Sequence, residues 1–175
     1  IKDNAYFSNG DKITASDVKF SYQTLTGKDA HPQYKIYWSD IREVIILDKK
    51  SIKFIFNQKN PELHMIIGDI PVFSKKWFNG KKFSESILDE PIASGPYIIN
   101  KYETGRFIEY KKNPNYWDKA NQHVDEIHLK IINQQLSRMQ ALQAGQMDFL
   151  WLPPALAIVA KKDKSLRHVT GPSFF

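Results

Sequence analysis

The chain has 175 residues and a formal net charge of +6, with 42% hydrophobic, 13% aromatic and 25% charged residues. This composition supports a hydrophobic core and argues against a disordered chain. The absence of cysteine excludes a disulfide scaffold, a thiolate zinc site, an iron–sulfur cluster and a cysteine nucleophile. No stretch reaches the roughly 18 consecutive apolar residues of a membrane span, and two prolines interrupt the longest apolar run, at 150–160.

The first predicted element is a helix that begins after Thr14. Thr14 and Asp17, three residues apart, have the pattern of a capping box, and Gly27 marks the end of the helix. Apolar residues recur at the spacing of one helical face, namely Val18, Tyr22 and Leu25. Residues 28–37 predict a loop or an interrupted helix.

Two β-hairpins follow along the chain. Residues 42–47 and 51–56 flank a polar turn, and residues 97–102 and 106–111 flank a turn in which Gly105 suits a left-handed position. We expect further strands at 126–132 and 147–150, and helices at 62–67, 74–78 and 134–144. Strands and helices mixed without strict alternation predict the α/β class, with a mixed α+β arrangement in this stretch.

The sequence offers no constellation for catalysis or metal binding. Five histidines lack the spacing of a metal motif: His31, His64, His123, His128 and His168. No nucleophile elbow or phosphate-binding loop is present. We therefore predict no enzyme activity, no cofactor and no metal. The lysine doublets are scattered, which disfavours the alternative of a nucleic-acid-binding module, whose affinity would fall steeply with salt.

Five segments in order resemble one family. They read NGDKITASDVKFS at 9–21, ASGPY at 93–97, RFIEYKKNPNYW at 106–117, VDEI at 124–127 and ALQAGQMDF at 141–149. Together they resemble the family 5 extracellular solute-binding proteins, the dipeptide- and oligopeptide-binding components of ABC importers. The stretch between the first two segments resembles the branch for oligopeptide and peptide-antibiotic uptake. Ala93 and Gln146 depart from the family pattern.

The resemblance implies a type II periplasmic-binding-protein fold, present here as a fragment. Residues 1–90 would form part of an extra subdomain of the first lobe, and residues 91–175 part of that ligand-binding lobe, with the second lobe absent. The implied function is the capture of oligopeptides or peptide-like solutes in the periplasm and their delivery to an ABC permease in the inner membrane, by an exported protein whose signal peptide is absent from this sequence. A ligand-binding sensor of the same fold is the alternative.

Five residues are candidates for contact with the ligand. Trp151 and Leu152 follow the expected strand 147–150, and Trp151 is interpreted either as the wall of a side-chain pocket or as core filling. Ser173 and Phe174 resemble the segment that lines the cleft, with a core strand as the alternative. Tyr34 lies in a region that the resemblance places near the ligand entrance, although a packed aromatic loop is the favoured interpretation of this residue.

Overall fold

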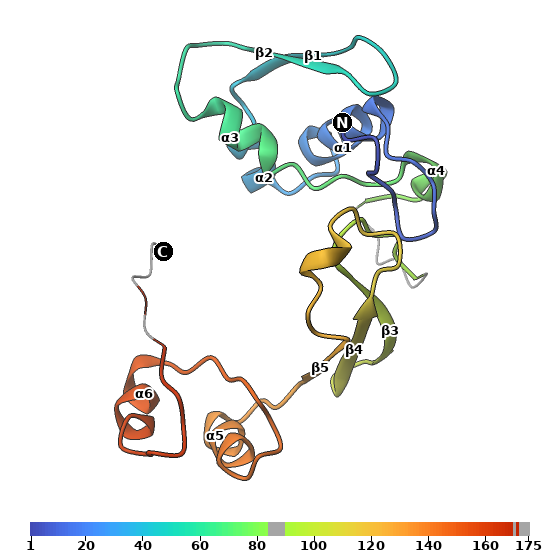
Figure 1. Ribbon diagram of the computed structural model, residues 1–175. Coiled ribbons are helices and arrows are strands. Elements are labelled where there is room, and N and C mark those ends of the chain that lie inside the picture. The colour runs from blue at the N-terminus through green and yellow to red at the C-terminus, as the bar shows by residue number, and fades with distance from the viewer. Residues whose placement is uncertain (84–89, 170, 172–175) are drawn as a thin grey trace. The chain divides into compact units, whose positions relative to one another are not determined.

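The computed structural model describes residues 1–83, 90–169 and 171. The chain divides into two compact units, the first made of Ile1–Tyr102 and Ile108–His128 and the second of Glu103–Phe107 and Leu129–Phe175 (Figure 1). Each unit is described by itself below. No helix among the described residues is long and apolar enough to cross a membrane.

Helix α1 (Ala15–Thr26) opens the first unit. The Thr14 hydroxyl accepts a hydrogen bond from the Asp17 amide, and the Asp17 carboxylate accepts one from the Thr14 amide. This reciprocal pair is the capping box that the sequence predicts, and the helix ends before Gly27 as expected. One face of α1 reaches the core through Leu25, which is buried, and Tyr22, which packs against the same cluster.

The core of the first unit lies between α1 and a β-hairpin. Strands β1 (Ile41–Ile46) and β2 (Ile52–Phe56) pair antiparallel, which confirms the first predicted hairpin to within one residue at each end. Buried residues from the helices, β1 and a loop form one cluster: Leu25, Trp38, Ile41, Val44 and Ile70. One face of β2 packs against this cluster through Ile52, Phe54 and Phe56, which alternate along the strand.

Three short helices complete this part of the chain. They are α2 (Pro32–Tyr37), α3 (Leu63–Gly68) and α4 (Lys75–Phe78). Pro32 occupies the first turn of α2, where a missing amide hydrogen leaves no helical hydrogen bond unmade. Helix α2 lies in the stretch 28–37, for which the sequence predicted a loop or an interrupted helix. The other two helices agree with the predictions for 62–67 and 74–78.

A three-stranded sheet follows, in the order β3-β4-β5. Its strands are β3 (Tyr97–Glu103), β4 (Phe107–Lys112) and β5 (Glu126–Lys130), and a 3-10 helix, η1 (Lys119–Asn121), precedes β5. Gly105 between β3 and β4 has a φ of 76°, the left-handed conformation predicted for this turn. Strand β5 ends two residues before the predicted boundary.

The second unit contains two helices, α5 (Gln135–Gln143) and α6 (Pro154–Ala160). Helix α5 is the predicted helix, and Gly145 just after it has a φ of 70°. The prediction of a strand at 147–150 is wrong, because no described strand lies beside these residues to form a ladder. Helix α6 was not predicted, since the prolines at 153 and 154 suggested an interruption.

Candidate functional site

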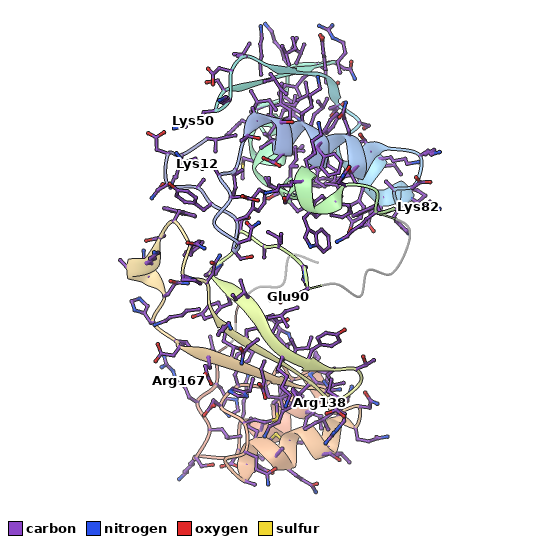
Figure 2. The ribbon with its side chains drawn as sticks, turned by 90° about the vertical axis from the view of Figure 1, so that its right-hand side faces the viewer. Lys12, Lys50, Lys82, Glu90, Arg138 and Arg167 are labelled. Atoms are coloured by element: carbon purple, nitrogen blue, oxygen red, sulfur yellow. The ribbon has the colours of Figure 1, made fainter. Side chains whose placement is uncertain are left out.

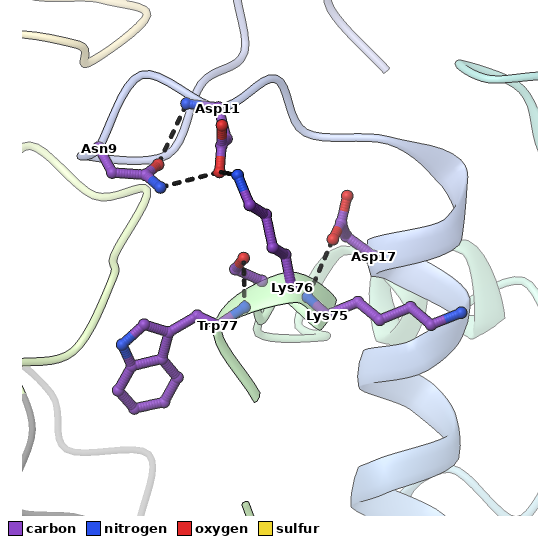
Figure 3. A network of polar contacts seen from close by, with 7 residues as sticks. Asn9, Asp11, Asp17, Lys75, Lys76 and Trp77 are labelled. Carbon is purple, nitrogen blue, oxygen red and sulfur yellow. Dashed lines mark hydrogen bonds and ion pairs between the residues drawn. The ribbon is translucent and has the colours of Figure 1, made fainter. Parts of the chain in front are cut away.

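The first family-like segment builds a structural junction in the first unit (Figure 3). The Asp17 carboxylate accepts hydrogen bonds from the Thr14 amide at 2.9 Å, from the Thr14 hydroxyl at 2.6 Å and from the Lys75 amide at 3.0 Å. It therefore caps α1 and fixes the start of α4. The buried Ser21 hydroxyl bridges the same two regions, since it donates to the Asp17 carbonyl and accepts from the Phe73 amide, each at 2.7 Å.

The turn before α1 is tied to α4 by charge. The Asp11 carboxylate accepts from the Asn9 side-chain amide at 2.9 Å and from the Lys76 ammonium at 3.2 Å (Figure 3). These two donors, the Asn9 amide first, hold the pKa of Asp11 below its ordinary value. The carboxylates of Asp11 and Asp17 thus connect backbone segments of the first unit.

The second and third family-like segments also hold each other. The buried Asn113 side chain donates to the Gly95 carbonyl at 2.8 Å, and its backbone amide donates to the Pro96 carbonyl at 2.9 Å. The side-chain amide of Gln122 donates to the same Pro96 carbonyl. Asn115 donates to the Ser8 carbonyl at 2.9 Å, which brings in the N-terminal segment. These contacts give the 93–97 loop a structural role in the first unit.

The candidate ligand-contact segment is the irregular stretch 147–152 in the second unit, which belongs to no helix or strand. It lies between α5 and α6, and its start is held by the Lys130 ammonium, which donates to the Gln146 carbonyl at 3.0 Å. At its other end Pro153 caps α6. No hydrogen bond joins the backbone of residues 147–152 to any residue that the structure describes. Its amides and carbonyls are therefore unpaired within the described chain.

Two aromatic side chains project from this segment. Phe149 is 70% exposed and Trp151 is 82% exposed, and their rings meet edge to face with centroids 6.0 Å apart. Unpaired backbone next to an aromatic pair is a surface that an extended peptide can use, with main-chain bonds to the backbone and side-chain contacts to the rings.

The other predicted site residues are distributed as follows. Leu152 is half-buried in the same segment as Trp151. Tyr34 belongs to the first unit, is 41% exposed, and stacks on Trp38 with ring centroids 5.8 Å apart. Ser173 and Phe174 lie outside the described residues. Phe149 was missed as a site residue, although its two-residue spacing from Trp151 was a signal that could have revealed it.

A small cavity of about 340 Å³ lies in the first unit, apart from all of the predicted site residues. Its lining is polar and aromatic: Asn4, Tyr6, Gly10, Asn115, Tyr116, Trp117 and Lys119. The Lys2 ammonium sits 3.1 Å from the centroid of the Trp117 ring. Within residues 1–83, 90–169 and 171, no group of three His, Asp or Glu side chains is placed to hold a metal ion.

Comparison with protein families gives one match. Residues 1–175 match the bacterial extracellular solute-binding proteins, family 5 Middle. The chain belongs to this family. A putative binding protein of Brucella melitensis is 32% identical over 85% of the chain and 25% of its own length. The probable peptide-binding protein YejA of Agrobacterium fabrum is 28% identical over 99% of the chain and 29% of its own length.

The fold agrees with this assignment. The substrate-binding domain of an oligopeptide ABC transporter from Bacillus anthracis superposes with a TM-score of 0.81 at 21% identity, over 94% of the chain and 35% of that structure. The chain therefore has part of a type II periplasmic-binding-protein fold, as the sequence predicted. It spans about a quarter to a third of the length of these relatives.

Proposed function

We propose that the protein is the substrate-binding component of an ABC transporter and captures peptides or peptide-like solutes. The observation that carries the proposal is the family match along the whole chain, together with a relative named as a peptide-binding protein. Such a component binds its ligand and releases it unchanged to a membrane permease. No step of this function requires a catalytic residue.

The geometry of the 147–152 segment supports a peptide as ligand. An extended peptide presents a regular row of amides and carbonyls, and the unpaired backbone of this segment offers matching partners. The exposed rings of Phe149 and Trp151 then contact a ligand side chain without selecting its chemistry strongly. We assign ligand contact to Trp151 and Leu152, with Tyr34, Ser173 and Phe174 as further contacts.

The proposal assigns different roles to the two parts of the chain. Residues 1–90 are assigned to an extra subdomain of the first lobe and residues 91–175 to the part of that lobe that binds ligand. A second lobe, contributed by another part of the whole protein, would close on the peptide by hinge motion. The family is one of extracellular solute-binding proteins, and we place this member in the periplasm beside its permease.

Native mass spectrometry of the whole protein, purified gently from a peptide-rich culture, tests the substrate class. A ladder of added masses that match short peptides is the expected result. A single discrete mass that is not a peptide would retain the fold and overturn the substrate. If the purified protein carries nothing, the same measurement is repeated after incubation with a synthetic peptide mixture, and continued absence of a peptide adduct would contradict the proposal.

A further inference from the structure

The net positive charge of the protein lies mainly in the second unit. By sequence this unit holds seven Lys and Arg residues against three Asp and Glu residues, although it is the smaller unit. Most of these charges follow α6 directly, in the run K-K-D-K-S-L-R-H at 161–168. Four Lys and Arg side chains and one His therefore lie within eight residues, with a single carboxylate among them.

The folded conformation turns the basic side chains of this run outward. Residues at a spacing of three point inward: Ala160 is fully buried, and Asp163 and Leu166 are half-buried. The basic residues of the run are all exposed: Lys161, Lys162, Lys164, Arg167 and His168. Figure 2 labels one of them, Arg167. No ion pair joins any of these five to a described residue.

The one carboxylate in the run is occupied by internal contacts. Asp163 accepts from the Ser165 hydroxyl at 2.6 Å and the Ser165 amide at 3.0 Å, and its other oxygen accepts from the Gln143 side chain of α5 at 2.9 Å. These donors stabilise the charged carboxylate and hold the pKa of Asp163 below its ordinary value. Asp163 therefore fixes the run against α5, and within the described chain no ion pair joins it to the lysines or the arginine of the run.

An exposed apolar pair in the last turn of α6 directly precedes the basic run in the chain. Ile158 is 66% exposed and Val159 is 61% exposed, whereas Leu156 and Ala157 of α6 are half-buried. Figure 1 shows α6 continuing directly into the turns that carry the basic residues. Exposed aliphatic side chains next to unpaired lysines are the arrangement by which peripheral helices rest on an anionic lipid surface.

We propose that α6 and residues 161–168, here called the basic surface, bind the anionic phospholipid surface of a membrane. The basic side chains contact lipid phosphates, while Ile158 and Val159 enter the boundary with the acyl chains. A protein partner is less well matched, since protein interfaces are depleted in lysine and enriched in aromatic residues and arginine. A bilayer requires no fixed geometry, which suits lysines that no neighbour restrains. This inference goes beyond capture of a ligand and does not depend on the ligand's identity.

Vesicle sedimentation of the whole protein tests the proposal. The probe is vesicles of equimolar phosphatidylcholine and phosphatidylglycerol, compared with vesicles of phosphatidylcholine alone. We expect binding to the anionic vesicles only, weakened by salt because exposed charges are screened. The triple variant Lys161→Gln, Lys162→Gln, Lys164→Gln should bind about fivefold more weakly for each charge removed, on the order of a hundredfold in total.

Two further variants make the result specific. The matched control Lys53→Gln, Lys59→Gln, Lys111→Gln removes three exposed charges from the first unit and should bind like the wild type. The double variant Ile158→Gln, Val159→Gln keeps every charge and should lose several-fold in binding. Peptide adducts in native mass spectrometry should be the same for all of these proteins, which separates this proposal from the proposed function.

Three outcomes would overturn the proposal. The first is equal sedimentation with neutral and anionic vesicles, or none with either. The second is an equal loss of vesicle binding in the control variant, which would show that binding depends only on the overall charge of the protein. The third is binding of the protein to a DNA duplex with the same affinity as to the anionic vesicles. If the Ile158 and Val159 substitutions leave both affinities unchanged, the surface binds polyanions in general.

Discussion

At the scale of single residues, the Asp17 carboxylate joins the starts of two helices, at Thr14 and at Lys75, and Lys75 lies 58 residues after Asp17. The substitution Asp17→Asn keeps the size of the side chain but replaces one acceptor oxygen with an amide donor. We expect a loss of about 2 kcal/mol in the free energy of unfolding, since a partly buried backbone amide loses a charged partner. Urea denaturation measures it. The control Asp29→Asn, at an exposed residue, should leave the free energy unchanged.

A second residue-scale prediction concerns Trp151. Because its side chain contacts mainly Phe149 and solvent within the described chain, Trp151→Ala should leave the melting temperature of the whole protein within experimental error. Peptide affinity should fall about tenfold, the effect of losing an aromatic contact of ~1 to 1.5 kcal/mol. Calorimetry of peptide binding gives the affinity. The control Tyr102→Ala removes an exposed ring from β3 and should change neither quantity. A large drop in melting temperature for Trp151→Ala would assign the ring to the core instead.

At the scale of elements, the turn between β3 and β4 depends on Gly105. A Cβ there would meet no atom within 4 Å, so only the φ of 76° opposes a side chain. We expect Gly105→Ala to cost about 1 to 2 kcal/mol of stability. Gly68→Ala is the matched control, because it has equal space, lies at the end of α3 and has no left-handed φ. The control should be neutral or slightly stabilising, and equal losses in both variants would contradict the argument.

Elements were predictable where their signals are local. The capping box at Thr14 and Asp17 and the glycine turn at 105 each fix a boundary within a few residues, and the structure has both. The strand expected at 147–150 failed because a strand exists only with a neighbour, which local sequence does not reveal. Helix α6 was missed because Pro154 suggested a break, although proline at the first helical position is favourable.

The candidate site was less predictable than the fold. Trp151 was singled out by its position after a motif, but its exposure depends on tertiary packing that no spacing encodes. The edge-to-face pairing with Phe149 depends on the conformation of residues 147–152, which the sequence pattern did not reveal. The junction around Asp17 likewise joins segments far apart in sequence, and only its capping half was visible beforehand.

At the scale of the whole molecule, four carboxylates couple stability to pH. Hydrogen bonds and ion pairs hold the pKa below 3.8 in Asp11, Asp48, Asp125 and Asp163. The main donors are the Asn9 side chain, the Lys50 amide, the Lys112 ammonium and the Ser165 hydroxyl, respectively. The unfolded chain therefore takes up protons at a higher pH than the folded protein does, and stability must rise with pH across this range.

The contribution of these carboxylates is fully present above the unfolded pKa of about 4 and is lost as the pH falls through the lower folded values. Urea denaturation between pH 7 and pH 3 should thus give a free energy of unfolding that is level at the upper end and declines below about pH 4. Changing all four residues to Asn should flatten the decline, whereas Asp29→Asn alone should preserve it. A decline of unchanged slope in the fourfold variant would show that other groups drive acid unfolding.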